Sequence, residues 1–82
     1  MFTVYALRSE RDGRIYVGFS EHLERRLKEH NAGQVTSTKA YLPWSILYTL
    51  EVETRLEARQ QEKKFKSGFG KEFLKSKVHI PR

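Results

Sequence analysis

The stretch Arg14 to His30, RIYVGFSEHLERRLKEH, decides the fold that this sequence predicts. Residues 14–19 alternate as a β-strand does, and the residues after them have the periodicity of an α-helix. One face of that helix carries two leucines together with a cation and an imidazole: Leu23, Arg26, Leu27 and His30. Because burying an unpaired charge is costly, we expect Arg26 to have an anionic partner, and a substrate can supply one.

Composition narrows the class of protein. The 82 residues predict one domain over residues 1–82, with a core too small to enclose a deep cavity, so any site should be a shallow groove. The net charge of +6 favours a polyanion, such as nucleic acid or an anionic membrane surface, as partner. The absence of Cys excludes disulfides and Cys-based zinc sites. Without a signal-peptide pattern or a membrane-length apolar run, we expect a cytoplasmic protein with no membrane contact.

A second strand precedes the opening stretch and is expected to pair with it. Residues 2–8, FTVYALR, alternate in polarity, and a turn containing Gly13 follows them. With a four-residue loop over 9–12, Tyr5 lies directly opposite Tyr16 on one face, whereas a five-residue loop would place the two tyrosines on opposite faces. At the end of 14–19, Gly18 permits close backbone approach because it has no side chain.

The middle of the chain predicts a helix, a polar loop and a third strand. The helix should run from about Glu21 to Asn31, with Ser20 as its N-cap and Gly33 as a left-handed C-terminal cap. After the polar loop 34–43, the strand 45–51 should place three apolar residues on one face: Ile46, Tyr48 and Leu50.

The last third of the chain predicts two more helices. Thr54 and Glu57 form a capping box that begins a helix over 55–66. On one face of this helix a carboxylate lies between apolar residues: Ala58, Glu62 and Phe65. A short helix over 70–76 should follow, and the aromatic and aliphatic residues expected to cover the sheet are Phe69, Phe73 and Leu74. The core is expected over about 2–76, with a frayed C-terminal tail, KSKVHIPR.

Five polar residues are expected to point inward: Tyr5, Tyr16, Arg26, His30 and Glu62. Each has a structural explanation, since tyrosines are common in half-buried strands and His30 suits a helix C-terminus. Arg26 and Glu62 can also form a structural ion pair with each other. Together, however, a carboxylate, a guanidinium, an imidazole and two phenols are the groups that phosphodiester hydrolysis uses. One carboxylate is enough for Mg²⁺, which keeps several of its waters.

TVY at Thr3 to Tyr5 and YVG at Tyr16 to Gly18 resemble the two halves of the signature of GIY-YIG nucleases. The segment FSEHLERRLKEHNAG resembles that family's first helix, with its catalytic Arg at Arg26 and its His at His30. LEARQQEKKFKSG resembles the second helix, with the metal-binding Glu at Glu62. Thr replaces the first Gly and Val replaces both isoleucines, which keeps the strand character. The resemblance covers nearly the whole chain and is closest to the short, single-domain bacterial branch.

The resemblance implies an α+β fold in the order β-β-α-β-α-α, with a three-stranded antiparallel sheet flanked by two main helices and a short C-terminal helix. It also implies a DNA endonuclease that depends on Mg²⁺ or Mn²⁺, is structure-directed or weakly specific, and acts in DNA repair, recombination or processing. In that scheme Tyr5 is the base for an attacking water, Tyr16 positions water or phosphate, and Arg26 stabilises the transition state. His30 orients Tyr5 or shuttles its proton, and Glu62 holds the metal on the leaving-group side.

The expected substrate is DNA, including branched or damaged DNA, and no small-molecule cofactor is implied. We expect contacts to the phosphate backbone from lysines, namely Lys39, Lys63, Lys64, Lys66 and Lys71. A monomer is favoured. The main alternative is a nucleic-acid-binding module that keeps the fold without turnover, and metal-dependent cleavage separates the two. A third hypothesis is a protein-interaction domain that uses the loop 41–44 and binds independently of salt.

Overall fold

The computed structural model describes residues 1–77 and has the predicted α+β order, β-β-α-β-α-α. The three strands, which form one antiparallel sheet in the order β2-β1-β3, are β1 (Phe2–Ser9), β2 (Ile15–Ser20) and β3 (Trp44–Val52). The helices are α1 (Leu23–Asn31), α2 (Arg55–Lys66) and α3 (Gly68–Lys75), with a 3-10 turn, η1 (Lys39–Tyr41), before β3. Of the tail predicted to fray, Lys75 ends α3, and residues 78–82 lie outside the described part of the chain.

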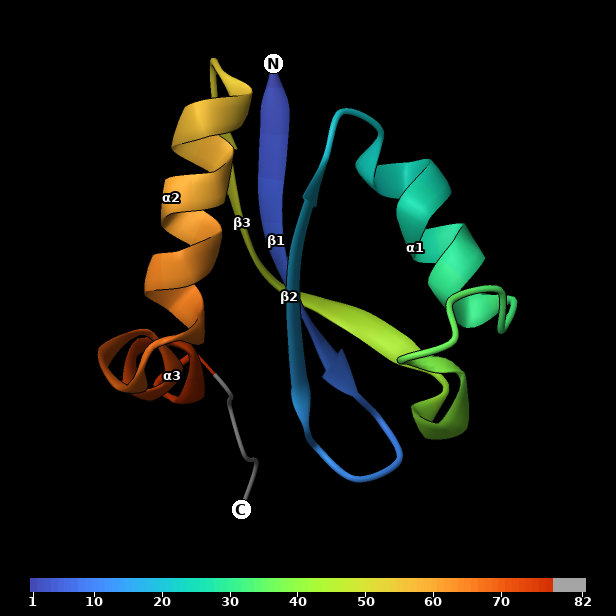
Figure 1. Ribbon diagram of the computed structural model, residues 1–82. Coiled ribbons are helices and arrows are strands. Elements are labelled where there is room, and N and C mark those ends of the chain that lie inside the picture. Colours follow the sequence, from blue (N-terminus) through green and yellow to red (C-terminus); the bar gives the residue numbers. More distant parts are fainter. Residues whose placement is uncertain (78–82) are drawn as a thin grey trace.

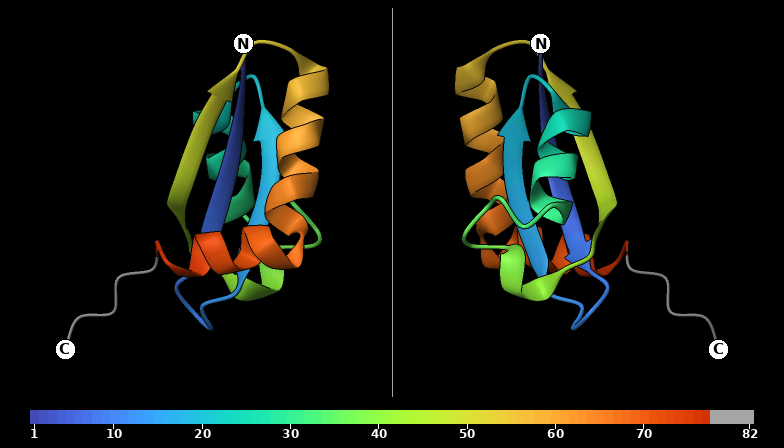
Figure 2. Two further views of the ribbon diagram at one scale, coloured as in Figure 1. Left: turned by 90° about the vertical axis from the view of Figure 1, so that its left-hand side faces the viewer. Right: turned by 90° about the vertical axis from the view of Figure 1, so that its right-hand side faces the viewer.

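The central strand β1 is buried on both faces, and this divides the molecule into two layers of helix around one sheet (Figure 1). Val4 and Ala6 face a core that α2 and α3 complete. Tyr5 and Leu7 face a second core that includes apolar residues of α1 and of the segment before β3. Figure 2 shows the helices on the two sides of the sheet. As β2 lies at the sheet edge, helices from both layers border it.

The pairing of β1 with β2 differs from the prediction by two residues. Tyr5 lies opposite Gly18, and Tyr16 lies opposite Leu7, so the two tyrosines are diagonal neighbours rather than direct partners. A shift of two residues keeps every side chain on its predicted face. The cause is Gly13, whose φ of 81° suits a loop and not a strand, so the loop occupies 10–13 instead of 9–12.

A β-bulge changes the predicted pattern of β3. Ala6 pairs with Tyr48, whereas the next residue, Leu7, pairs with Ile46, which leaves Leu47 as an extra residue. Ile46 therefore leaves the face that it was predicted to share with Tyr48, and it is 46% exposed. Leu47 packs against the core beneath α2 instead.

The ends of α1 agree with the prediction only in part. Ser20 is not the N-cap, because α1 begins at Leu23 after His22. The Ser20 hydroxyl instead accepts a hydrogen bond from the His22 amide at 2.9 Å, in the turn that leads into the helix. The left-handed conformation of Gly33, with φ of 76°, is confirmed.

The predicted start of α2 is confirmed, whereas α3 begins earlier than expected. The Thr54 hydroxyl accepts from the Glu57 amide at 3.1 Å, and α2 spans the predicted residues. The helix α3 begins at Gly68 rather than residue 70, capped by the Ser67 hydroxyl. Phe73 packs on the core as predicted, but Phe69 lies beyond it in the first turn and is 74% exposed.

Candidate active site

The phenol of Tyr5 lies over the edge strand β2 at the position of Gly18. Tyr5 lies on β1 opposite Gly18 of β2, and a Cβ on Gly18 would lie 2.9 Å from the Tyr5 hydroxyl oxygen. The same atom would lie 3.2 Å from the Tyr16 ring, whose centroid is 6.4 Å from that of Tyr5. The glycine therefore leaves the space in which the two phenols gather, and the close approach is by side chain rather than backbone.

His30 at the end of α1 completes this cluster of rings. It is 0% exposed, and its Nε2 lies 3.3 Å from the Tyr5 hydroxyl oxygen. Its ring also lies edge-on to Tyr16, with the centroids 4.9 Å apart. The spacing along α1 that suggested an inward imidazole therefore reflects a direct contact with both tyrosines.

The hydrogen bonds of His30 define its tautomer. Its Nδ1 lies 2.8 Å from the hydroxyl of Thr38, and that hydroxyl donates to the Val35 carbonyl at 3.3 Å. A hydroxyl has one proton, so the Thr38 oxygen accepts from Nδ1–H. Nε2 then carries a lone pair and accepts the proton of the Tyr5 hydroxyl. The hydroxyl proton of Tyr5 is thus directed inward, and its lone pairs remain for other partners.

Thr38 is a functional candidate that the sequence did not reveal. It lies in the polar loop before β3, where no periodicity marks a buried position, yet it is almost fully buried. Besides holding His30, its carbonyl accepts from the Trp44 indole at 2.9 Å. The loop is therefore fastened to the core at the residue that orients the imidazole.

Arg26 forms its ion pair within α1. Its guanidinium lies 2.8 Å from the Glu29 carboxylate, and the two side chains are 35% and 31% exposed. The structural alternative of a pair with Glu62 is wrong, because the ion pair of Glu62 in residues 1–77 is with Lys66, at 3.3 Å. The i,i+3 spacing of Arg26 and Glu29 along the sequence is the local signal for this pair.

Burial raises the pKa of the Tyr5 phenol above its ordinary value of 10.0. The facing Arg26 guanidinium lowers it and only partly offsets the burial, while Tyr16 and Glu62 raise it further. Burial also lowers the pKa of His30 from 6.5, and the nearby positive charge of Arg26 acts in the same direction. At neutral pH the cluster therefore holds a protonated phenol and a neutral imidazole.

Glu62 approaches from the other layer. It lies on α2 between the buried Ala58 and Phe65, is 22% exposed, and acts on the Tyr5 pKa through its charge. Within residues 1–77 it makes no hydrogen bond or ion pair with Arg26 or with the three rings of the cluster, Tyr5, Tyr16 and His30. The described residues contain no group of three or more His, Asp or Glu that could hold a metal. A single carboxylate suits a hydrated Mg²⁺ that completes its shell with water and phosphate oxygens.

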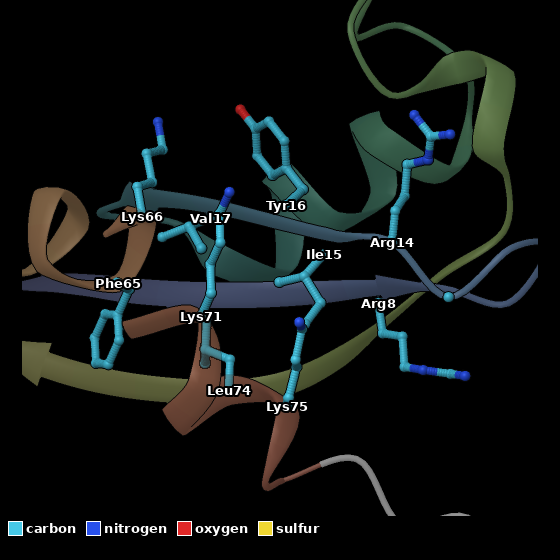
Figure 3. A pocket seen from close by; sticks show the side chains of 11 residues that line it. Arg8, Arg14, Ile15, Tyr16, Val17, Phe65, Lys66, Lys71, Leu74 and Lys75 are labelled. Atoms are coloured by element: carbon cyan, nitrogen blue, oxygen red, sulfur yellow. The ribbon is translucent and has the colours of Figure 1, made fainter. Parts of the chain in front are cut away.

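The five lysines predicted to contact DNA do not share one surface. Lys66 and Lys71 line a groove between β2 and the helices α2 and α3 (Figure 3). Lys64 lines a different groove, beside β3. Lys39 lies in η1 next to Gly33, and Lys63 is exposed on α2.

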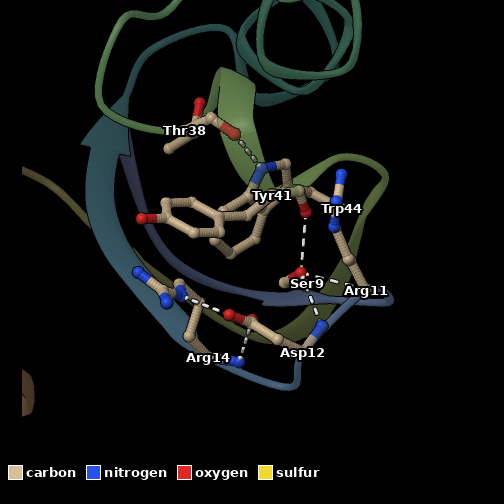
Figure 4. Close-up of polar contacts among 7 residues, drawn as sticks. All are labelled: Ser9, Arg11, Asp12, Arg14, Thr38, Tyr41 and Trp44. Carbon is tan, nitrogen blue, oxygen red and sulfur yellow. Dashed lines mark hydrogen bonds and ion pairs between the residues drawn. The ribbon is translucent and has the colours of Figure 1, made fainter.

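The aromatic residues of the loop 41–44 are used inside the fold. Trp44 is buried, and its indole donates to Thr38 (Figure 4). The guanidinium of Arg14 lies 3.4 Å from the centroid of the Tyr41 ring, whose backbone carbonyl accepts from the Ser9 hydroxyl at 2.7 Å. Because of these contacts, little of the loop 41–44 is available for the protein interaction that the sequence suggested.

Within residues 1–77, no helix has the length and apolar character that crossing a membrane requires.

Comparison with known proteins shows the family to which the chain belongs. The family model described as the GIY-YIG catalytic domain matches residues 1–76, and the chain therefore belongs to the GIY-YIG family, a nuclease superfamily. Its relatives are UPF0213 proteins, the short single-domain branch of that family.

Two such relatives come from bacilli. The UPF0213 protein of Bacillus licheniformis is 42% identical over 57 residues, which cover 68% of this chain and 59% of the relative. That of Bacillus velezensis is 39% identical over 56 residues, covering 67% and 57%. The matches thus span less than two thirds of these relatives. The solution NMR structure of a UPF0213 protein from Bacillus halodurans has a TM-score of 0.56 and 31% identity, and it covers 93% of this chain and 84% of that one.

The contact at Gly18 predicts a loss of stability when a methyl group is added there. In Gly18→Ala the new Cβ would lie 2.9 Å from the hydroxyl oxygen of the buried Tyr5 and 3.2 Å from the Tyr16 ring. One of these side chains must then shift, so the free energy of unfolding should fall by about 1–3 kcal/mol. Urea denaturation measures this. The control is Gly68→Ala, where nothing lies within 4 Å of an added Cβ and stability should not fall. Equal stability of both variants and the parent would contradict the described packing.

The buried imidazole predicts that acid destabilises the fold. The pKa of His30 is lower in the folded protein than in the unfolded chain, so the unfolded state binds the proton more readily. The His30 contribution to stability should be complete above about pH 6.5 and be lost as the pH falls below it. Unfolding free energies measured across this range should show a steeper pH dependence in the parent than in His30→Gln. The control, His22→Gln, replaces an exposed imidazole and should keep the parent's pH dependence.

Proposed function

We propose that this protein is a divalent-metal-dependent DNA endonuclease that hydrolyses phosphodiester bonds with weak sequence specificity, in DNA repair, recombination or processing. The main support is the cluster of Tyr5, Tyr16, His30 and Arg26 at the edge strand β2, with Glu62 within electrostatic reach. These residues supply a proton acceptor and a phosphate-binding cation in one cluster, with a carboxylate within electrostatic reach, and phosphodiester hydrolysis uses these groups.

In this proposal Tyr5 is the general base. A neutral phenol cannot take up a second proton, so Tyr5 would act as a phenolate, after its hydroxyl proton is lost to solvent. The contact with Nε2 of His30 fixes the orientation of the phenol, and the phenolate takes a proton from the attacking water and becomes neutral again. His30 is a poor store for a second proton because its pKa is lowered. We therefore assign His30 the task of orienting Tyr5 rather than shuttling its proton. The raised pKa of Tyr5 means that the phenol needs a cation close to it to act as a base near neutral pH.

Arg26 would bind the scissile phosphate. Its partner Glu29 is about one third exposed, and pairs of this kind contribute only about 0–1 kcal/mol, so a phosphate group can replace the carboxylate. The guanidinium can then make two parallel hydrogen bonds to phosphate oxygens and stabilise charge that develops in the transition state. Tyr16, packed on His30, would position the water or a phosphate oxygen.

Glu62 would hold the metal ion, Mg²⁺ or Mn²⁺. When bound, such an ion supplies Lewis-acid stabilisation of the phosphate and of the leaving oxygen. The Glu62 carboxylate also acts on Tyr5 directly, because its negative charge raises the pKa of the phenol, and neutralising that charge would let the phenol ionise more readily near neutral pH.

The alternative is a nucleic-acid-binding module without turnover. It is favoured by the ion pairs that already occupy both charged residues, Arg26 with Glu29 and Glu62 with Lys66. Incubation with supercoiled, branched and single-stranded DNA, with and without Mn²⁺, separates the two functions, since a binding module cleaves none of them.

Two substitutions test the catalytic assignment. Arg26→Ala and Glu62→Ala should each lower Mn²⁺-dependent cleavage by at least about 10²-fold, because each removes charge stabilisation of the transition state. The folded state should lose only about 0–1 kcal/mol, since both residues pair in partly exposed sites. DNA binding should weaken modestly in the first variant and hold or strengthen in the second. Unfolding of both variants, or full activity in both, would instead assign the two residues a structural role.

The ion pair of Glu62 predicts competition between Lys66 and the metal. In Lys66→Gln the carboxylate loses an ammonium 3.3 Å away, so its affinity for Mn²⁺ should rise. An exposed pair worth up to about 1 kcal/mol corresponds to an increase of at most about fivefold. Paramagnetic broadening of NMR signals near Glu62 during a Mn²⁺ titration measures this. Lys64→Gln, on the same helix and outside any ion pair within residues 1–77, should leave the affinity unchanged, and an equal effect in both variants would refute direct competition.

A further inference from the structure

A groove of about 650 Å³ runs beside the candidate active site, between the edge strand β2 and the helices α2 and α3 (Figure 3). Its floor is apolar and consists of Ile15, Val17, Phe65 and Leu74. Its rim is cationic and consists of Arg8, Arg14, Lys66, Lys71 and Lys75. No acidic residue is among the side chains that line it. The groove therefore combines a hydrophobic base with a positive border.

The rim stays positive when neighbouring carboxylates are taken into account. Three of its cations have a carboxylate partner, at 2.7 Å for Arg14, 3.3 Å for Lys66 and 3.7 Å for Lys75. Arg8 and Lys71 form no ion pair with the described residues. The existing pairs involve cations that are at least half exposed, and such pairs hold weakly, so anionic groups of a ligand can replace them.

The groove is continuous with the site already described. Tyr16 belongs to both, because it lines the groove and its ring packs on His30. Lys66 also belongs to both, because it lines the groove and its ammonium is bound to the Glu62 carboxylate. A polymer that passes through the ring cluster can therefore continue along β2 into the groove.

We infer that this groove binds the segment of nucleic-acid strand on one side of the scissile phosphate. Phosphates would lie along the rim, where Arg8 and Lys71 are available to them, and sugar and base would lie on the floor around Ile15. Uncharged groups that cover the apolar floor remove it from water, which favours binding. Phosphates that are neutralised at the rim release their counterions, which also favours binding. The inference rests on the proposed function for the identity of the polymer, and it adds a subsite with its own residues.

An NMR titration tests the location. The full chain is titrated with a short oligonucleotide in metal-free buffer, so that no cleavage occurs. The methyl signals of Ile15, Val17 and Leu74 should shift, whereas those of Leu50, which lines the groove beside β3, should not. The inference is overturned if the shifts are larger at Leu50 than at Ile15. It is also overturned if Ile15 shifts with protein concentration when no oligonucleotide is present, because another copy of the chain would then occupy the groove.

Affinity measurements test the two parts of the groove separately. Lys71→Glu should weaken oligonucleotide binding by about 3- to 10-fold. The slope of log affinity against log salt concentration should also fall by the amount expected for about one phosphate contact. The matched control is Lys64→Glu, an exposed lysine beside the other groove, which should weaken binding much less. Ile15→Ala should weaken binding without changing its salt dependence, since it removes only apolar surface. Equal effects of Lys71→Glu and Lys64→Glu, or an unchanged affinity in Ile15→Ala, would refute the groove.

Failure of this inference is distinguishable from failure of the proposed function. If wild-type protein cleaves DNA with Mn²⁺ but the groove variants bind normally, only the groove is refuted. If the oligonucleotide occupies the groove but nothing is cleaved, the groove stands as a binding site and the endonuclease proposal falls. An acidic peptide that produces the same shifts with equal affinity would also refute the inference, because the site would then select negative charge rather than a nucleic-acid strand.

Discussion

The buried hydrogen bond between the Tyr5 hydroxyl and Nε2 of His30 is the constraint on which this small structure depends. Each group is buried, where an unsatisfied polar atom costs about 1–3 kcal/mol, so the contact satisfies one polar atom on each side. The bond forms only if Gly18 leaves room over β2, if the end of α1 lies against the sheet, and if Thr38 accepts from the far side of the imidazole. The packing of α1 and the geometry of the candidate site are therefore the same set of contacts.

The site divides its residues by charge. The rings of Tyr5 and His30 are fixed by burial, and the ring of Tyr16 packs against both. The charged groups of Arg26 and Glu62 instead lie at partly exposed edges and are held by partners on their own helices. Such a division suits a site whose geometry must be constant while its anionic and cationic ligands come and go. Fixed burial of the two charges would require permanent partners, and a phosphate or metal could displace those only at high cost.

The sequence predicted the elements well because local patterns determine them, and it failed where distant residues decide. The capping box at Thr54 located α2, and helical spacing brought Arg26 and His30 to the same side of α1. The register of the hairpin depends on the positive φ of Gly13, which excludes that residue from a strand. The residue types of the turn alone do not determine that conformation. The exposure of Ile46 results from a bulge that no alternation rule predicts. Thr38 was missed because its role exists only through contacts with His30 and Trp44.

Lys66 connects the two surfaces that surround β2. Its ammonium lies 3.3 Å from the Glu62 carboxylate and it also borders the groove, so it can hold the carboxylate or an anionic group in the groove, but only one of them at a time. A cation on Glu62 would release the ammonium toward the phosphates of a strand in the groove, and a phosphate that holds Lys66 would likewise free Glu62 for the cation. Because linkage is reciprocal, metal and strand would each strengthen the binding of the other by the same factor. If Glu62 holds the metal as proposed, a lysine four residues away on the same helix would produce this coupling without any movement of the backbone.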